Sequence, residues 1–153
     1  MTAETFIPNT SERVPRHTPQ ATNERIRRKT LESLERFDGA DSQMIDARIA
    51  ELRREWDIER ALEANAATVA LLGLGLGVFV DRRWLALPAI VGGFLLQHAI
   101  QGWCPPLPLF RRLGVRTAAE IHEEITALQT MRGDFGSVTD PASALQQASL
   151  RSY

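Results

Sequence analysis

Two long apolar stretches, separated by three polar residues, dominate the hydropathy pattern of the chain. Residues 64–80 hold no charged side chain over 17 positions, and residues 84–103 hold none over 20. Between them lie Asp81, Arg82 and Arg83. An uncharged apolar stretch of about 18 or more residues is typical of a helix that spans a membrane. The pattern therefore predicts two transmembrane helices joined by a tight turn.

The segment before the first stretch carries a helical period. Its apolar side chains recur at spacings of four, three and four: Ile45, Ile49, Leu52 and Trp56. The opposite face is charged, as in an amphipathic helix, and Asp41 is a suitable N-cap. Neither proline nor glycine occurs between Gly39 and Gly73, so one continuous helix is predicted to run into the first stretch.

This apolar face has two interpretations. It packs against a neighbouring helix, predicted over residues 24–37 with Asn23 as its cap, or against the membrane surface. Alternatively, it is the seam of a coiled-coil dimer, for which only about two heptads are available, whereas sustained coiled coils show three or four.

After the second stretch, the sequence Cys104-Pro105-Pro106-Leu107-Pro108 cannot continue a regular helix. Thr117 and Glu120 then form a capping-box pattern. It opens a helix whose apolar face is Ile121, Ile125, Leu128 and Met131, and Gly133 supplies a stop.

These elements predict an all-α membrane protein with a transmembrane hairpin, amphipathic cytoplasmic helices and disordered termini. The predicted divisions are a disordered segment 1–22, charged amphipathic helices 23–62, the hairpin domain 63–117, an amphipathic helix 118–133 and a flexible tail 134–153.

Aromatic and basic residues orient the hairpin. Trp56, Trp84 and Trp103 stand at the ends of the two stretches, which matches the aromatic belts of a bilayer. Seven arginines flank the outer ends and two lie in the turn; the seven are Arg48, Arg53, Arg54, Arg60, Arg111, Arg112 and Arg116. The bias places both termini in the cytoplasm. The absence of an apolar stretch in the first 60 residues predicts no signal peptide.

Small and polar residues inside the stretches suggest how the helices associate. Gly73 and Gly77, with Gly92 and Gly93, would allow close backbone approach, either within the hairpin or in a homo-oligomer. An intramembrane polar cluster is predicted from Asn65, Thr68, Gln97, His98 and Gln101. Interhelical hydrogen bonding is the first interpretation of this cluster, and a proton relay or ligand site at His98 is the second.

Cys104 is the only cysteine, so an internal disulfide is excluded. It is a candidate reactive thiol, because two prolines expose the backbone beside it and Arg111 and Arg112 follow closely. The alternative is an ordinary reduced cysteine, since reactivity requires a specific environment.

Two short motifs carry a family likeness. Gly102-Trp103-Cys104-Pro105 closes the second stretch, and Leu113-Gly114-Val115-Arg116-Thr117 follows it. Over residues 56–117 the chain resembles the YgaP-like transmembrane domain, a family of small bacterial inner-membrane hairpin proteins of largely unknown function. The resemblance implies a bacterial inner-membrane location and dimerisation. Some members are fused to a rhodanese sulfurtransferase domain, but this chain has no such α/β region and no second cysteine.

The favoured function is a non-enzymatic membrane anchor or assembly protein that presents cytoplasmic helices to a protein partner. The alternatives are a redox or sulfur-relay component using Cys104 with a separate rhodanese-like partner, an oligomeric transporter or channel subunit, and a soluble helical hairpin. No cofactor or metal is predicted, because Walker, nucleophile-elbow and clustered-ligand patterns are missing. The net charge of −1 gives no basis for nucleic-acid binding.

Overall fold

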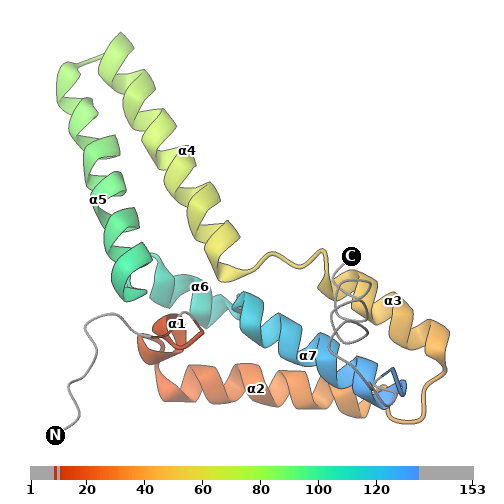
Figure 1. Cartoon of the computed structure of the whole chain (residues 1–153). Coiled ribbons are helices and arrows are strands. Elements are labelled where there is room, and N and C mark those ends of the chain that lie inside the picture. Colours follow the sequence, from red (N-terminus) through yellow and green to blue (C-terminus); the bar gives the residue numbers. More distant parts are fainter. Residues whose placement is uncertain (1–8, 10, 135–153) are drawn as a thin grey trace, which may run out of the picture.

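The computed structural model describes residue 9 and residues 11–134, and every regular element in this part of the chain is helical. The helices are α1 (Arg13–Arg16), α2 (Gln20–Glu35), α3 (Ser42–Leu52), α4 (Ile58–Phe79), the 3-10 turn η1 (Arg82–Leu85), α5 (Ala86–Gln101), α6 (Leu107–Leu113) and α7 (Ala118–Met131). Figure 1 shows α4 and α5 projecting as a hairpin from a layer of α2, α3 and α7, with α1 and α6 at its base.

The hairpin consists of two helices that are long and apolar enough to cross a membrane. Asp81 caps the turn between them by accepting a hydrogen bond from the Arg83 amide at 2.8 Å. Only 22% of the most apolar window of α4 is buried, and only 6% of the corresponding window that ends in α5. The core helix of a soluble protein would be mostly buried, so these surfaces are unlike such a core.

The prediction of one continuous helix from residue 42 into the hairpin is wrong. Helix α3 ends at Leu52, and α4 begins at Ile58 after a turn. Asp57 caps the new helix, since its carboxylate accepts a hydrogen bond from the Arg60 amide at 2.8 Å. Trp56 consequently leaves the apolar face of α3; it is 51% exposed, and the Arg60 guanidinium lies over its ring.

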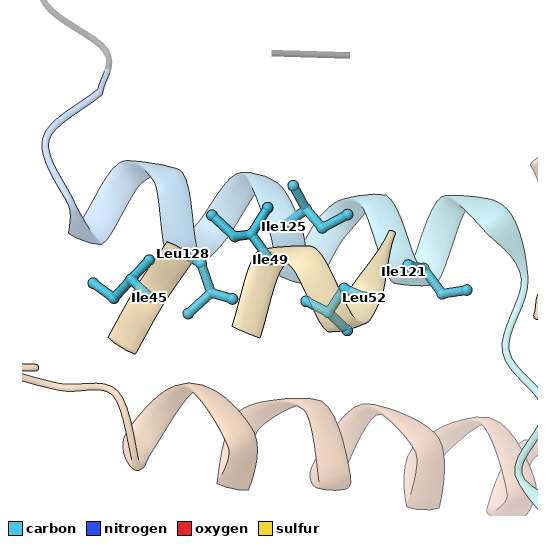
Figure 2. Packing of buried hydrophobic residues seen from close by; sticks show 6 residues of the cluster. All are labelled: Ile45, Ile49, Leu52, Ile121, Ile125 and Leu128. Atoms are coloured by element: carbon cyan, nitrogen blue, oxygen red, sulfur yellow. The ribbon is translucent and has the colours of Figure 1, made fainter. Parts of the chain in front are cut away.

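The apolar face of α3 packs inside the chain, as the first interpretation of its periodicity expected, but its main partner is α7. Figure 2 shows the two helices side by side with six buried residues between them: Ile45, Ile49, Leu52, Ile121, Ile125 and Leu128. Leu34, in the last turn of α2, and Phe37, two residues after its end, pack against this cluster. The face is therefore occupied within the monomer and leaves no coiled-coil seam on α3. The capping box that starts α7 is confirmed.

The N-terminal segment is more ordered than its composition predicts. Residues 1–8 and 10 lie outside the described residues, but Arg13–Arg16 is helical and Val14 is 2% exposed. Val14 is buried because it joins Ile58, Leu62, Cys104 and Leu107 in a second core at the base of the hairpin. The predicted tail lies outside the described residues from position 135 onward.

Two further boundaries differ from the sequence prediction. Helix α2 begins at Gln20, so Asn23 is not its cap. Instead, the Asn23 side-chain amide donates a hydrogen bond to the Pro15 carbonyl at 3.0 Å. Helix α6 was not predicted, because its seven residues are too few to show a period.

Candidate functional site

Three chemically capable side chains meet where the hairpin joins the other helices. Glu59 lies in the first turn of α4, His98 in the last turn of α5, and Cys104 in the segment that follows α5. The Nε2 atom of His98 is 2.8 Å from Glu59 Oε2. The Cys104 side chain interacts with the same imidazole. A carboxylate, an imidazole and a thiol are thus arranged in series.

The protonation of His98 follows from these contacts. An ionised carboxylate can only accept hydrogen bonds, so Nε2 carries the hydrogen that faces Glu59. Nδ1 is buried and, apart from the Cys104 thiol, has no partner among the residues that the structure describes. In the neutral imidazole this atom holds a lone pair that can take a proton from a thiol.

Arg13 completes the ionic contacts of the site from α1. Its guanidinium contacts Glu59 Oε1 at 2.9 Å and donates a hydrogen bond to the Ala99 carbonyl at 3.0 Å. The Arg13 backbone also comes close to Gly102, which ends α5 with a φ of +81°. A Cβ at Gly102 would lie 2.6 Å from the Arg13 carbonyl oxygen, so glycine is required both by the conformation and by the approach.

An apolar pocket of about 250 Å³ adjoins the thiol and the imidazole. Leu62, Asn65, Ala66 and Val69 line it from one face of α4. The opposite wall comes from α5 and from the prolines after Cys104, and comprises Leu87, Ile90, Val91, Phe94, Leu95, Pro105 and Pro106. Both Cys104 and His98 also line it, so the pocket reaches the buried thiol and imidazole.

Of the five residues predicted as an intramembrane polar cluster, His98 is the one whose side chain bonds across the hairpin. The Thr68 hydroxyl donates to the Ala64 carbonyl of its own helix at 2.7 Å. Asn65 is exposed and lines the pocket, while Gln97 and Gln101 are half-buried. The partner of His98 is Glu59, which was not assigned to the cluster.

Glu59 could have been found from the register of the hairpin. In an antiparallel pair that turns near residues 81–83, positions equally far from the turn lie opposite one another. Glu59 therefore faces the end of α5, which contains His98. Glu59 lies outside the uncharged stretch, but α4 begins at Ile58 and so includes it.

Cys104 is buried, with 5% of its surface exposed, although its prolines were expected to open the segment. Leu107 and Phe110 pack in the same cluster and cover it. Arg111 is fully buried and directs its guanidinium to Glu120, Asn23, Thr18 and the Val115 carbonyl. Those hydrogen bonds occupy one of the two guanidinium groups that were expected to act on the thiol. The other, that of Arg112, belongs to an exposed residue.

A second group of charges lies between α2, α3 and α7. Arg116 pairs with Glu55 and Glu124, and the Glu124 carboxylate also accepts hydrogen bonds from Ser33 and Arg48. Burial raises the pKa of Glu124, but the donors Arg116, Ser33 and Arg48 outweigh it and hold the pKa below its usual value. This carboxylate is saturated with donors and supports the fold.

The same balance applies to Glu120 at the start of α7. Burial raises the pKa of its carboxyl. The Arg111 guanidinium, through two hydrogen bonds of 2.7 and 2.8 Å, and the Thr117 amide lower this pKa by more than burial raises it. The net pKa lies below the usual value. Among the described residues, no group of His, Cys, Asp or Glu is arranged to hold a metal ion.

Of the four glycines predicted to allow close helix packing, two lie at a helix contact and two do not. Gly73 and Gly77 are buried and face α5 and η1, where a Cβ at Gly73 would lie 2.8 Å from Pro88 Cδ. Gly92 and Gly93 have open space around the same position. Trp84 lies in η1 at the tip of the hairpin, and Trp103 follows α5 at its base.

Comparisons of the chain with protein-family models, with curated proteins and with solved structures gave no match. The resemblance to the YgaP-like domain therefore rests on the motifs around Cys104 and Thr117 alone.

Proposed function

We propose that the chain is an integral protein of the bacterial inner membrane, in which the α4–α5 hairpin anchors a folded helical layer at the cytoplasmic face and presents it to a protein partner. The exposed apolar surface of the hairpin carries this proposal, because it needs a covering that the described chain does not provide. Helix α4 has 22 residues, which span about 33 Å and suffice for a hydrocarbon core of about 30 Å.

The distribution of polar groups supports the proposed orientation. The tip of the hairpin holds Arg82, Arg83 and Trp84, whereas the arginines that pair with carboxylates lie beyond its base. Aromatic residues at both ends of a hairpin match the two membrane interfaces. The excess of arginine on the side of the helical layer favours the cytoplasm for that side.

Cysteine labelling tests this arrangement. The chain is first made cysteine-free by Cys104→Ser, and a single cysteine is then placed at the tip by Arg82→Cys or on the layer by Met44→Cys, a position that is 53% exposed. A membrane-impermeant maleimide should label position 82 in spheroplasts and position 44 in inverted vesicles. Labelling of both positions from the same side, or release of the protein by alkaline carbonate, would refute the anchor.

The proposed partner should bind the helical layer, because this is the part of the chain that the hairpin presents to the cytoplasm. A photo-reactive amino acid at Leu31, an apolar residue of α2 that is 52% exposed, should give one discrete adduct in cells. The same amino acid at Arg82 serves as the control and should give no such adduct. A pattern that is identical at the two positions would argue against a partner of the layer.

A second candidate function is a sulfur relay through Cys104, and the contact of its thiol with His98 favours it. It predicts a persulfide on Cys104 in cells that carry a separate rhodanese-like donor. Intact-mass analysis of the purified chain should show one additional sulfur, which reduction removes. Its absence under sulfur-donating conditions would leave the anchor as the function.

A further inference from the structure

We propose that Cys104 is a self-acylation site, which takes a long-chain acyl group from a soluble acyl thioester and holds the part of the chain nearest the thioester in the pocket between α4 and α5. The proposal combines three observations: a thiol that lines the pocket, a buried imidazole beside it whose Nδ1 has no described partner other than this thiol, and an apolar wall. It goes beyond the anchor function and does not depend on the topology of the hairpin.

The imidazole distinguishes this site from an ordinary buried cysteine. His98 is 4% exposed, it lines the pocket, and its Nδ1 has no partner among the described residues other than the Cys104 thiol. A buried ring nitrogen with no other partner is placed to accept the thiol proton. Glu59 fixes the ring from the other side at 2.8 Å, as the third group does in nucleophile–base arrangements.

The pocket supplies the substrate class. Its lining residues on α4 recur at positions 62, 65, 66 and 69, so one helix face runs along the pocket for about 10 Å. Apart from Asn65, His98 and Cys104, the lining consists of aliphatic side chains, proline and one phenylalanine. An extended alkyl chain fits such a wall, because each buried methylene contributes about 0.8 kcal/mol. A charged or hydroxylated ligand would find few partners there.

The chemical step is a thioester exchange. Cys104 Sγ attacks the carbonyl carbon of the donor thioester as His98 Nδ1 takes the thiol proton. A carbon–sulfur bond to Cys104 forms and the carbon–sulfur bond of the donor breaks. The departing thiolate receives the proton from His98. The exchange involves no net oxidation or reduction and therefore needs no oxidant.

The test uses the full chain in mild detergent with palmitoyl-coenzyme A that carries an alkyne label. The wild-type chain should incorporate label that hydroxylamine removes, and Cys104→Ser should incorporate none. His98→Gln should lower the rate about 100-fold, which is the typical contribution of a general base. Spontaneous acylation is measured on Leu113→Cys in the Cys104→Ser background, because position 113 is 71% exposed and lies outside the pocket.

A matched pair of variants tests the pocket. Ala66→Phe fills it, whereas Ala67→Phe places the same side chain on the adjacent, exposed position that does not line it. Ala66→Phe should reduce palmitoyl transfer at least tenfold while transfer from acetyl-coenzyme A is retained, which also shows that the variant is folded. Ala67→Phe should match the wild type with both donors.

Three outcomes would overturn the proposal. The first is a wild-type rate no higher than that of the exposed cysteine at position 113. The second is palmitoyl transfer that does not respond to His98→Gln or to Ala66→Phe. The third is a chain purified from its native membrane that carries a persulfide and no acyl group on Cys104, which would support the sulfur relay instead.

Discussion

Glu124 shows how single residues hold the helical layer together. Its side chain has no exposed surface, yet it is ionised, because Arg116, Arg48 and Ser33 all donate to it. A carboxyl whose pKa is lower in the folded state than in the unfolded state contributes stability above the unfolded value. That stability is lost as the pH falls through the lower folded value.

The layer should therefore unfold in acid, with its stability falling as the pH decreases below about 4.5, the usual value for this carboxyl. Glu124→Gln should cost about 3–5 kcal/mol at neutral pH, because it leaves the buried Arg116 and the half-buried Arg48 without this partner, and it should flatten the acid dependence. Urea unfolding followed by circular dichroism at several pH values measures both effects. Glu123→Gln, at the exposed neighbouring position, is the control; an equal effect of both variants would contradict this role for Glu124.

At the scale of elements, Gly73 and Gly77 allow α5 and η1 to pack closely against one face of α4. A Cβ at Gly73 would lie 2.8 Å from Pro88 Cδ and 3.0 Å from Leu87 Cβ. The ring of Pro88 is rigid, so the helices must separate to admit a methyl group. A Cβ at Gly75, half a turn away, would meet nothing within 4 Å.

Gly73→Ala should therefore destabilise the hairpin by about 1–3 kcal/mol, as overpacking typically does. Gly75→Ala should be neutral or stabilising by up to about 1 kcal/mol, because alanine is the better helix former. Unfolding in mixed detergent micelles, followed by Trp84 fluorescence in a background with Trp56→Phe and Trp103→Phe, compares the two variants. If Gly75→Ala were the more damaging, Gly75 rather than Gly73 would mark a close helix contact, for example in a dimer.

Elements with a strong local signal were predictable, and those determined by distant contacts were not. The uncharged stretches predicted the hairpin helices, and Thr117 with Glu120 predicted the start of α7. The break at residues 53–57 was missed, because it contains neither proline nor glycine; its local signal is Asp57, which caps α4. Helix α1 was missed because four residues have no period, and it is folded by Val14 and Arg13 against the hairpin.

The candidate site was predictable only in its components. Cys104 and His98 were singled out from the sequence, but as members of separate groups. Their proximity depends on the turn at Gly102 and on the packing of α6 beneath it, which a single sequence does not encode locally. Glu59 joined them because α4 starts earlier than the uncharged stretch does.

At the scale of the whole molecule, two separate hydrophobic cores stabilise different parts of the fold. One joins α3 to α7 within the layer, and the other joins α1, the base of α4, Cys104 and α6. No residue is shared between the two sets of buried hydrophobics. Damage to the first core should consequently disrupt the layer and leave the hairpin anchored.

Leu128→Asp places a carboxylate at a position that is fully buried between α3 and α7. Burial of an unpaired charge is strongly unfavourable, so the layer should unfold and become sensitive to trypsin in inverted vesicles. The hairpin should still resist extraction by alkaline carbonate, since its apolar helices are unchanged. Met131→Asp, on the same helix but 42% exposed, should keep the layer resistant. Loss of membrane association in Leu128→Asp would mean that the two cores fold as one unit, and the anchor would then depend on the layer it carries.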